Sequence, residues 1–512
     1  MTVLDWWVIV TYLVALLLLA AWLGRKQGSR RDYFLGGGTL PAPALAISIL
    51  ATQCSTNSLL GAPAFVGFTL GGGLLWLQYE LAVPLAMLVL ALLFPVIHRA
   101  RPISIYAFLE ERLGRRSRLL ASACFLFFRG VATGITVYGV ASVLALITDI
   151  PYLAAVVLLM GVTVTYDVLG GMRAVVISDV VQMLLLVAAV VLALTQLGPV
   201  LFDNASALGE RTAPLLNDWG VDGSSDFGFW PMLFGGVFLY VAYYGFDQSQ
   251  AQRLLAAHDG NALRQVLLLN GLLRFPLVFA YCVLGLGLAA YASTEPEFIA
   301  GLPLNGSGDP NINLVFPSFV LQSFPSGLAG LAIVGLFAAA MSSIDSALNS
   351  LSASTMEDFL SPDAGEERLS FRRSKLITLA WGLFAVAFSF TVELIADTIL
   401  EAINKVGSLL NGPLLGLFVI ALLARSVGEK RALAGFAAGL AVNLYAGLFL
   451  PQLSWLWWNV LGCLVTLGVA LGLRGRALDW PSVVLPGLRG AAATLCVAST
   501  LMFSGLVMLQ LW

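Results

Sequence analysis

The chain has 512 residues, of which 59% are hydrophobic and only 11% charged, and its mean hydropathy is +0.90. Soluble proteins carry about 25% charged residues, so this chain has too few polar side chains to cover one water-soluble core. The net charge of -2 gives no indication of nucleic-acid binding.

Apolar runs recur from residue 6 to residue 511, which argues against a soluble protein with a single membrane anchor. Since each span needs about 20 apolar residues, we predict an all-α polytopic protein of the plasma (inner) membrane with about 14 transmembrane helices. Their approximate ranges are 6–23, 40–66, 72–98, 118–147, 151–170, 173–197, 229–252, 265–292, 325–352, 375–395, 400–425, 430–449, 453–473 and 489–511.

The first run is followed by the basic stretch 24–31, which is the reverse of the order in a cleavable signal peptide. All five cysteines lie inside apolar runs without metal-ligand spacing, so we expect small apolar side chains rather than disulfides or a metal site.

Basic residues predict the orientation, because loops rich in Lys and Arg stay in the cytoplasm. Alternate connections hold 23 of the 27 Lys and Arg residues, a count that includes Arg253, whereas the long loops 198–228 and 293–324 hold only Arg211. We therefore expect both termini to be extracellular or periplasmic, with the polar outer loops forming short caps.

Five stretches together resemble the sodium:solute symporter family, and they occur in order with suitable helices between them. They are 32–37 (DYFLGG), 106–114 (YAFLEERLG), 170–182 (GGMRAVVISDVVQ), 243–253 (YYGFDQSQAQR) and 341–350 (MSSIDSALNS). The resemblance covers about residues 5–475.

The resemblance implies a sodium-coupled carrier and not an enzyme, with sodium as coupling ion and no other cofactor. It also implies a leucine-transporter-type inverted repeat of 5+5 helices, with substrate and ions bound near the midplane where the first helix of each repeat is broken. The expected segments are a flanking helix and loop (1–39), the first repeat (40–197), an outer loop (198–228), the second repeat (229–425) and C-terminal flanking helices (426–512).

The stretch 51–58 is an unusually polar run inside an apolar helix, and Gly61 and Pro63 follow it. These residues weaken a helix, so we expect a break that frees carbonyl oxygens for an ion. Close packing through small residues is the alternative explanation. By family correspondence, the common sodium site consists of the carbonyls of Ala51, Cys54 and Ala339 and the hydroxyls of Ser342 and Ser343. Those hydroxyls could instead bond to their own helix.

Two aspartates inside predicted helices, Asp179 and Asp345, point to a second cation, because an unpaired carboxylate in a membrane usually marks an ion or proton pathway. The resemblance implies a second sodium site of Asp179, Ser342, Asp345 and Ser346. Asp345 replaces a serine of sialate-transporting relatives, so the site could hold sodium more tightly or take a proton. Asp179 could alternatively pair with Arg173 at the cytoplasmic surface.

Candidates for the substrate site lie on the broken helices and their neighbours. They are Ser55, Ser58, Gln78, Glu80, Arg129, Tyr240, Tyr243 and Lys405. In sugar-transporting relatives, the position of Glu80 contacts substrate and that of Tyr243 is an inner gate. Tyr240 replaces a substrate-binding asparagine of those relatives, which argues against a hexose.

Lys405 stands where sugar carriers have a substrate-binding glutamine, and its ammonium group suits a carboxylate. An ion pair with Glu401, or snorkelling to the surface, would explain it equally well. Arg129 could bind the same anion or neutralise Glu80 or an aspartate, and Arg274 has the same ambiguity.

These features predict a transporter that couples inward sodium flow to uptake of a small organic anion, such as a monocarboxylate, by alternating access. Sugars, polyols, sialate and amino acids stay open as substrates. A proton-coupled carrier of the same fold, using Asp345 or Asp179, is the nearest alternative. The sequence has no continuous polar stripe for a channel, no large soluble segment for a sensor, and no catalytic constellation around His98 or His258.

Overall fold

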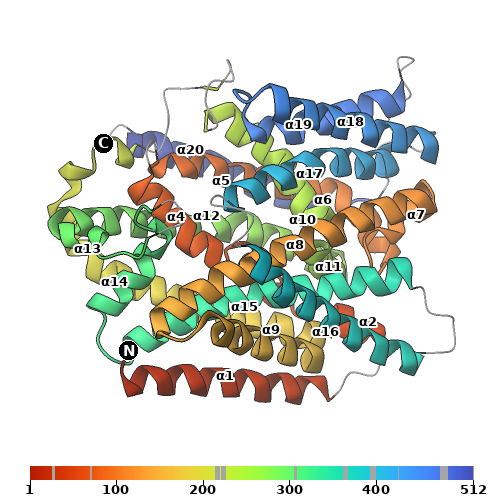
Figure 1. The fold of residues 1–512 in the computed structure, drawn as a ribbon. Coiled ribbons are helices and arrows are strands. Elements are labelled where there is room, and N and C mark those ends of the chain that lie inside the picture. Colours follow the sequence, from red (N-terminus) through yellow and green to blue (C-terminus); the bar gives the residue numbers. More distant parts are fainter. Residues whose placement is uncertain are drawn as a thin grey trace.

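The computed structural model describes residues 1–25, 29–69, 72–213, 219–220, 227–304, 308–360, 367–392, 399–424, 426–472 and 483–510. All regular elements in these ranges are helices (Figure 1). Among the described residues, nine helices are long and apolar enough to cross a membrane, or ten if the bent pair Arg30–Gly38 and Ala42–Gln53 is one span. The all-α prediction is confirmed, while the number of fourteen spans stays a prediction.

Nine α-helices lie among the described residues up to residue 203. They are α1 (Val3–Gly24), α2 (Arg30–Leu35), α3 (Ala42–Gln53), α4 (Thr56–Phe68), α5 (Leu77–Glu80), α6 (Ala82–Ala100), α7 (Ala107–Arg112), α8 (Arg115–Thr148) and α9 (Tyr152–Asp203). Gly171 interrupts α9 with φ 52° and ψ −160°, a backbone region open to glycine. The two predicted helices 151–170 and 173–197 therefore meet at this residue.

The second half begins with a π-turn (Pro231–Gly235) that continues into α10. The α-helices are α10 (Gly236–Phe246), α11 (Gln248–Ala256), α12 (Gly260–Thr294), α13 (Pro296–Ala300), α14 (Val315–Ser323), α15 (Leu328–Ser354), α16 (Glu367–Val392), α17 (Ile399–Leu423), α18 (Glu429–Phe449), α19 (Trp455–Leu471) and α20 (Leu488–Gln510). The outer loop 293–324 was expected to be polar, yet α14 lies within it and buries Phe316 and Phe319. A nine-residue helix is too short to stand out by hydropathy.

Helix α15 lies at the centre of the molecule and packs on α9, α1, α8 and α3. Almost every one of its side chains is buried. By contrast, α1 and α20 are peripheral, and α1 exposes Trp7, Leu18 and Trp22 as expected for a surface that faces lipid. The Asp5 carboxylate of α1 accepts hydrogen bonds from the backbone N–H groups of Gly327 and Gly330 at 2.7 and 2.8 Å, which fastens α1 to the start of α15.

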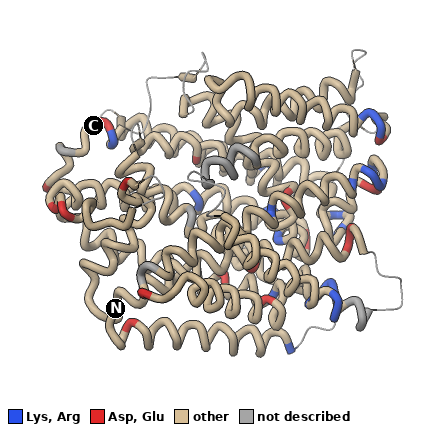
Figure 2. Tube along the Cα trace, in the orientation of Figure 1, with Lys and Arg blue, Asp and Glu red and all other residues tan. Residues whose placement is uncertain are grey.

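Most Lys and Arg residues gather at the end of the bundle where α2, α7 and the start of α16 lie (Figure 2). The start of α1 and the end of α20 lie at the opposite end (Figure 1). This charge asymmetry agrees with the segregation expected from the sequence.

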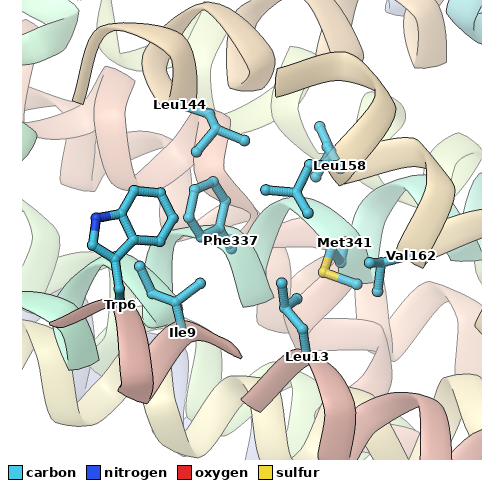
Figure 3. A pocket seen from close by; sticks show the side chains of 9 residues that line it. Trp6, Ile9, Leu13, Leu144, Leu158, Val162, Phe337 and Met341 are labelled. Carbon is cyan, nitrogen blue, oxygen red and sulfur yellow. The ribbon is translucent and has the colours of Figure 1, made fainter. Parts of the chain in front are cut away.

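An apolar cavity lies where α1 meets α8, α9 and α15 (Figure 3). Trp6, Ile9 and Leu13 of α1 face Phe337 and Met341 of α15 across it. Its nine lining side chains carry no oxygen, so this cavity offers nothing that a sodium ion would coordinate.

Candidate functional site

The helix that begins at residue 42 is interrupted within the polar run 51–58, as expected from the sequence. Helix α3 ends at Gln53 and α4 begins at Thr56, while Cys54 has φ −90° and ψ 54° and Ser55 is extended. The predicted break is therefore confirmed. The carbonyl of Cys54 accepts a hydrogen bond from the Tyr281 hydroxyl at 3.3 Å instead of continuing a helix.

A second interruption separates α10 from α11 at Asp247, which has extended backbone angles. Its carboxylate caps α11 by accepting the N–H of Ser249 at 2.8 Å. All nine residues of α11 are buried, so this polar helix lies inside the protein.

Three of the five residues expected for the common sodium site come together between α3, α9 and α15. Ala51, Ala339 and Ser342 line one small cavity there, with Gln182. The Ser343 hydroxyl donates to the carbonyl of Thr52 at 3.1 Å, directly before the break. The Ser342 hydroxyl is buried and lies beside the carboxylate of Asp179. Cys54 differs from these residues in that its carbonyl contacts α12 through Tyr281.

Asp179 and Ser346, both expected at a second sodium site, contact a guanidinium group. Arg253 Nη2 donates to Asp179 Oδ2 at 3.2 Å and to the Ser346 hydroxyl. Its Nε donates to the Ser48 hydroxyl at 2.5 Å, and that hydroxyl also donates to Asp179. The alternative pairing of Asp179 with Arg173 is wrong, because Arg173 bonds to the carbonyl of Gly36 and the hydroxyl of Thr39.

The prediction that Arg253 lies in a cytoplasmic loop is wrong. The side chain is fully buried in α11. The sequence did contain a signal, because Arg253 ends the 243–253 motif, in which six of the last seven residues are polar.

Asp345 lies next to Ser346 on α15, and among the described residues no Lys or Arg side chain is paired with its carboxylate. Its Oδ1 accepts the Ser346 hydroxyl at 3.1 Å, while Oδ2 has no partner in the described part of the chain. Sequence reasoning missed another buried carboxylate, Asp167 of α9, which accepts from the Asn349 amide at 3.3 Å. Its position inside an apolar run was the signal available.

Among the substrate candidates, Glu80 and Tyr240 meet at Arg274, close to the break in the first helix. Arg274 donates to the two carboxylate oxygens of Glu80 at 2.6 and 3.0 Å and to the Tyr240 hydroxyl at 2.9 Å. It also contacts the Tyr244 hydroxyl at 3.3 Å and the Cys54 thiol at 3.8 Å. Arg274 thus joins the substrate candidates to the α3–α4 break.

Arg129 and Tyr243 form a separate cluster at the second break. Arg129 Nη2 donates to Asp247 Oδ1 at 3.1 Å, to the Tyr243 hydroxyl at 3.4 Å and to the Ser249 hydroxyl. Its Nε is buried and has no acceptor among the described residues. Arg129 therefore neutralises an aspartate, Asp247, and not Glu80.

The remaining candidates are dispersed. Ser58 donates to the carbonyl of Gln53 at 3.2 Å across the break, Ser55 is buried, and Gln78 donates to the carbonyl of Leu75 at 3.3 Å. The side chains of Lys405 and Glu401 lie outside the described part of the structure, which gives only their backbone in α17.

Comparison with known proteins gives a family and a fold. The sequence model of the sodium:solute symporter family matches residues 33–468. The chain is 29% identical over 444 residues to sodium-coupled monocarboxylate transporter 1 of Xenopus laevis, covering 84% of this chain and 68% of that one. It is 26% identical over 469 residues to the sodium/sialic acid symporter SiaT of Proteus mirabilis, covering 90% of this chain and 92% of that one.

A solved structure of a sodium-coupled sialic acid symporter, in a substrate-bound outward-open state, superposes with a TM-score of 0.82 at 23% identity. The superposition covers 94% of this chain and 100% of the other, which confirms the leucine-transporter-type inverted-repeat fold. The chain therefore belongs to the sodium:solute symporter family and is a multi-pass membrane transporter, not an enzyme, that couples movement of a solute to sodium.

Proposed function

We propose that this symporter takes up a small organic anion, such as a short monocarboxylate. The observation that carries the proposal is the buried Nε of Arg129, a cationic donor without an acceptor among the described residues. A buried donor left unpaired is costly, and a carboxylate oxygen is the acceptor that pairs best with a guanidinium group.

The surroundings of Arg129 support this interpretation. Tyr243 and Tyr244 pack edge to face at 5.8 Å between ring centroids, with Arg129 against the first and Arg274 bonded to the second. Arg274 donates from two nitrogens to Glu80, whereas Arg129 contacts Asp247 through Nη2 alone. Because the Nε of Arg129 has no acceptor among the described residues, Arg129 is the better candidate for a substrate anion. Two relatives are named for carboxylate substrates, a monocarboxylate and sialic acid.

We further propose that sodium binds the carbonyls of Ala51, Cys54 and Ala339 and the hydroxyls of Ser342 and Ser343. A cation there would join the α3–α4 break to α15 and so order Cys54, which contacts Arg274. A substrate that binds the pocket more tightly once sodium has ordered it then shifts the population toward the closed state. The membrane potential adds about 2.3 kcal/mol per charge per 100 mV.

Uptake of radiolabelled short carboxylates into proteoliposomes tests the proposal, with and without an inward sodium gradient. We expect sodium-driven uptake in the wild type. Ser343→Ala should raise the sodium concentration for half-maximal uptake at least tenfold, and Arg129→Gln should raise the KM for carboxylate at least tenfold while sodium activation changes little. Thr165→Ala, at an exposed position of α9, is the matched control.

Sodium-driven uptake of a sugar or a neutral amino acid, without any carboxylate uptake, would contradict the anion proposal. Proton coupling is the second candidate, favoured by Asp345 Oδ2, which is buried and has no partner among the described residues. It predicts uptake driven by a proton gradient in sodium-free medium and lost in Asp345→Asn.

A further inference from the structure

The carboxyl group of Asp167 in α9 belongs neither to the proposed sodium site nor to the cluster around Arg129. Its side chain is fully buried within the apolar span Tyr152–Asp203. Oδ1 accepts a hydrogen bond from the Asn349 amide of α15 at 3.3 Å, whereas Oδ2 has no partner among the described residues. An ionisable side chain inside a membrane span is costly to keep there, which makes Asp167 a candidate functional group.

The charged and titratable groups around Asp167 do not pair with its carboxyl group. On α11, Arg253 acts on it only at a distance, since the guanidinium group bonds to another carboxylate. On α2, the Tyr33 hydroxyl donates to the backbone carbonyl of Asp167 at 3.3 Å, and Lys375 of α16 lies 5.9 Å from the Tyr33 ring centroid. On α1, which packs against the next residues of α9, Arg25 is exposed. Burial without a paired cation favours the neutral acid.

The oxygens near Asp167 suit a proton better than a sodium ion. A hard cation such as sodium takes several oxygen ligands at once. The Tyr33 hydroxyl is already paired with Thr378 Oγ1 at 3.1 Å, and Asn349 Oδ1 accepts from the Gln252 amide at 2.8 Å. Oδ2 of Asp167 is left without a partner in the described part of the chain, and one oxygen is all that a proton requires.

Gln252 of α11 joins the helices around Asp167. Its amide donates to the carbonyl of Phe34 on α2 and to Asn349 Oδ1 on α15, and Asn349 in turn donates to Asp167. These contacts form the Gln252 bridge. Helix α2 lies at the end of the bundle where Lys and Arg gather (Figure 2). Helix α11 follows the interruption at Asp247, and a shift of α11 there would break the bridge and admit water.

We propose that Asp167 binds a proton at Oδ2 while the Gln252 bridge is intact, and that it exchanges this proton with water once the bridge opens. Loading transfers a proton from hydronium to the carboxylate and forms the neutral acid, and release returns the proton to water. Because the intact arrangement binds the proton more tightly, a lower pH stabilises it and a higher pH favours the open one.

Infrared spectroscopy of the purified protein in a sodium-free, ester-free detergent tests this inference, because a protonated carboxylic acid and a carboxylate have separate C–O stretching bands. At about pH 7 we expect the wild type to show an acid band that Asp167→Asn removes, whereas an ordinary aspartate is ionised above about pH 5. Asp203→Asn, at the exposed end of the same helix, should leave the band unchanged. Any acid band of Asp345, which is also buried, is identified by its loss in Asp345→Asn.

Gln252→Leu tests the bridge. The Asp167 band should persist in the wild type from about pH 6 to about pH 8 and disappear over that range in Gln252→Leu, because water then reaches the carboxyl group. An unchanged acid band in folded Asp167→Asn, or the same pH profile in Gln252→Leu and the wild type, would overturn the inference. If Asp167→Asn does not fold, Asp167→Glu decides: it should move the band to a new frequency, and an unmoved band would overturn the inference. The measurement uses neither sodium nor substrate, so failure of the sodium-site or carboxylate proposal does not affect it.

Discussion

Arg274 and Glu80 form a two-point ion pair inside the helical bundle, at 2.6 and 3.0 Å. The carboxylate of Glu80 is fully buried, and the Tyr240 hydroxyl completes its surroundings at 3.3 Å. A buried charge is tolerated only when it is paired and hydrogen-bonded. The pair therefore stabilises the pocket beside Cys54 as one unit.

We expect Arg274→Gln to lower the free energy of unfolding by about 3–5 kcal/mol, because it leaves Glu80 buried without a cation. Adding Glu80→Gln should restore much of that loss, since the unpaired charge is then gone. Thermal unfolding in detergent, followed by tryptophan fluorescence, measures both effects. An equal or greater loss in the double variant would contradict this account.

Glu80 and Tyr240 were predicted as neighbours in function, and they are neighbours in space. Arg253 was assigned to a loop because hydropathy does not show whether a basic residue ends a helix or pairs with a buried carboxylate. The carboxylate that it contacts belongs to Asp179, which lies 74 positions earlier in the sequence. The partner of Arg253 is decided by the packing of α11 and α9 on the same two helices, α3 and α15.

At the scale of elements, helix interruptions at Cys54, Asp247 and Gly171 position the side chains of the candidate site. The interruption at Cys54 was predictable because Ser, Asn, Gly and Pro weaken a helix locally. We propose that the repeats span 40–197 and 229–425, with the breaks at Cys54 and Asp247 in corresponding helices.

The corner of α9 at Gly171 should be intolerant of a side chain. A Cβ atom there would lie 2.6 Å from Cδ2 of Tyr33, and the backbone angles are ones that other residues rarely adopt. We expect Gly171→Ala to destabilise the protein by about 1–3 kcal/mol. Thermal unfolding measures this, with Gly161→Ala as control on the same helix, where a Cβ meets nothing within 4 Å. Similar Tm values for the two variants would refute the explanation.

At the scale of the whole molecule, charge segregation leads us to propose that both termini face outward. Single cysteines at two exposed positions, Glu295→Cys and Lys430→Cys, test the orientation in a Cys496→Ser background. A membrane-impermeant maleimide should label residue 295 in intact cells and residue 430 only after permeabilisation. The opposite pattern would invert the topology.

The sequence by itself determined the membrane class, the approximate helices, the family and the first break, because these depend on composition, hydropathy and local backbone preference. The tertiary structure decided which charges meet. Arg129 pairs with Asp247, Arg274 with Glu80 and Arg253 with Asp179, across separations of 118, 194 and 74 residues. No local pattern specifies such pairs, since the electrostatic energy of a buried charge depends on the few atoms around it after the helices have packed.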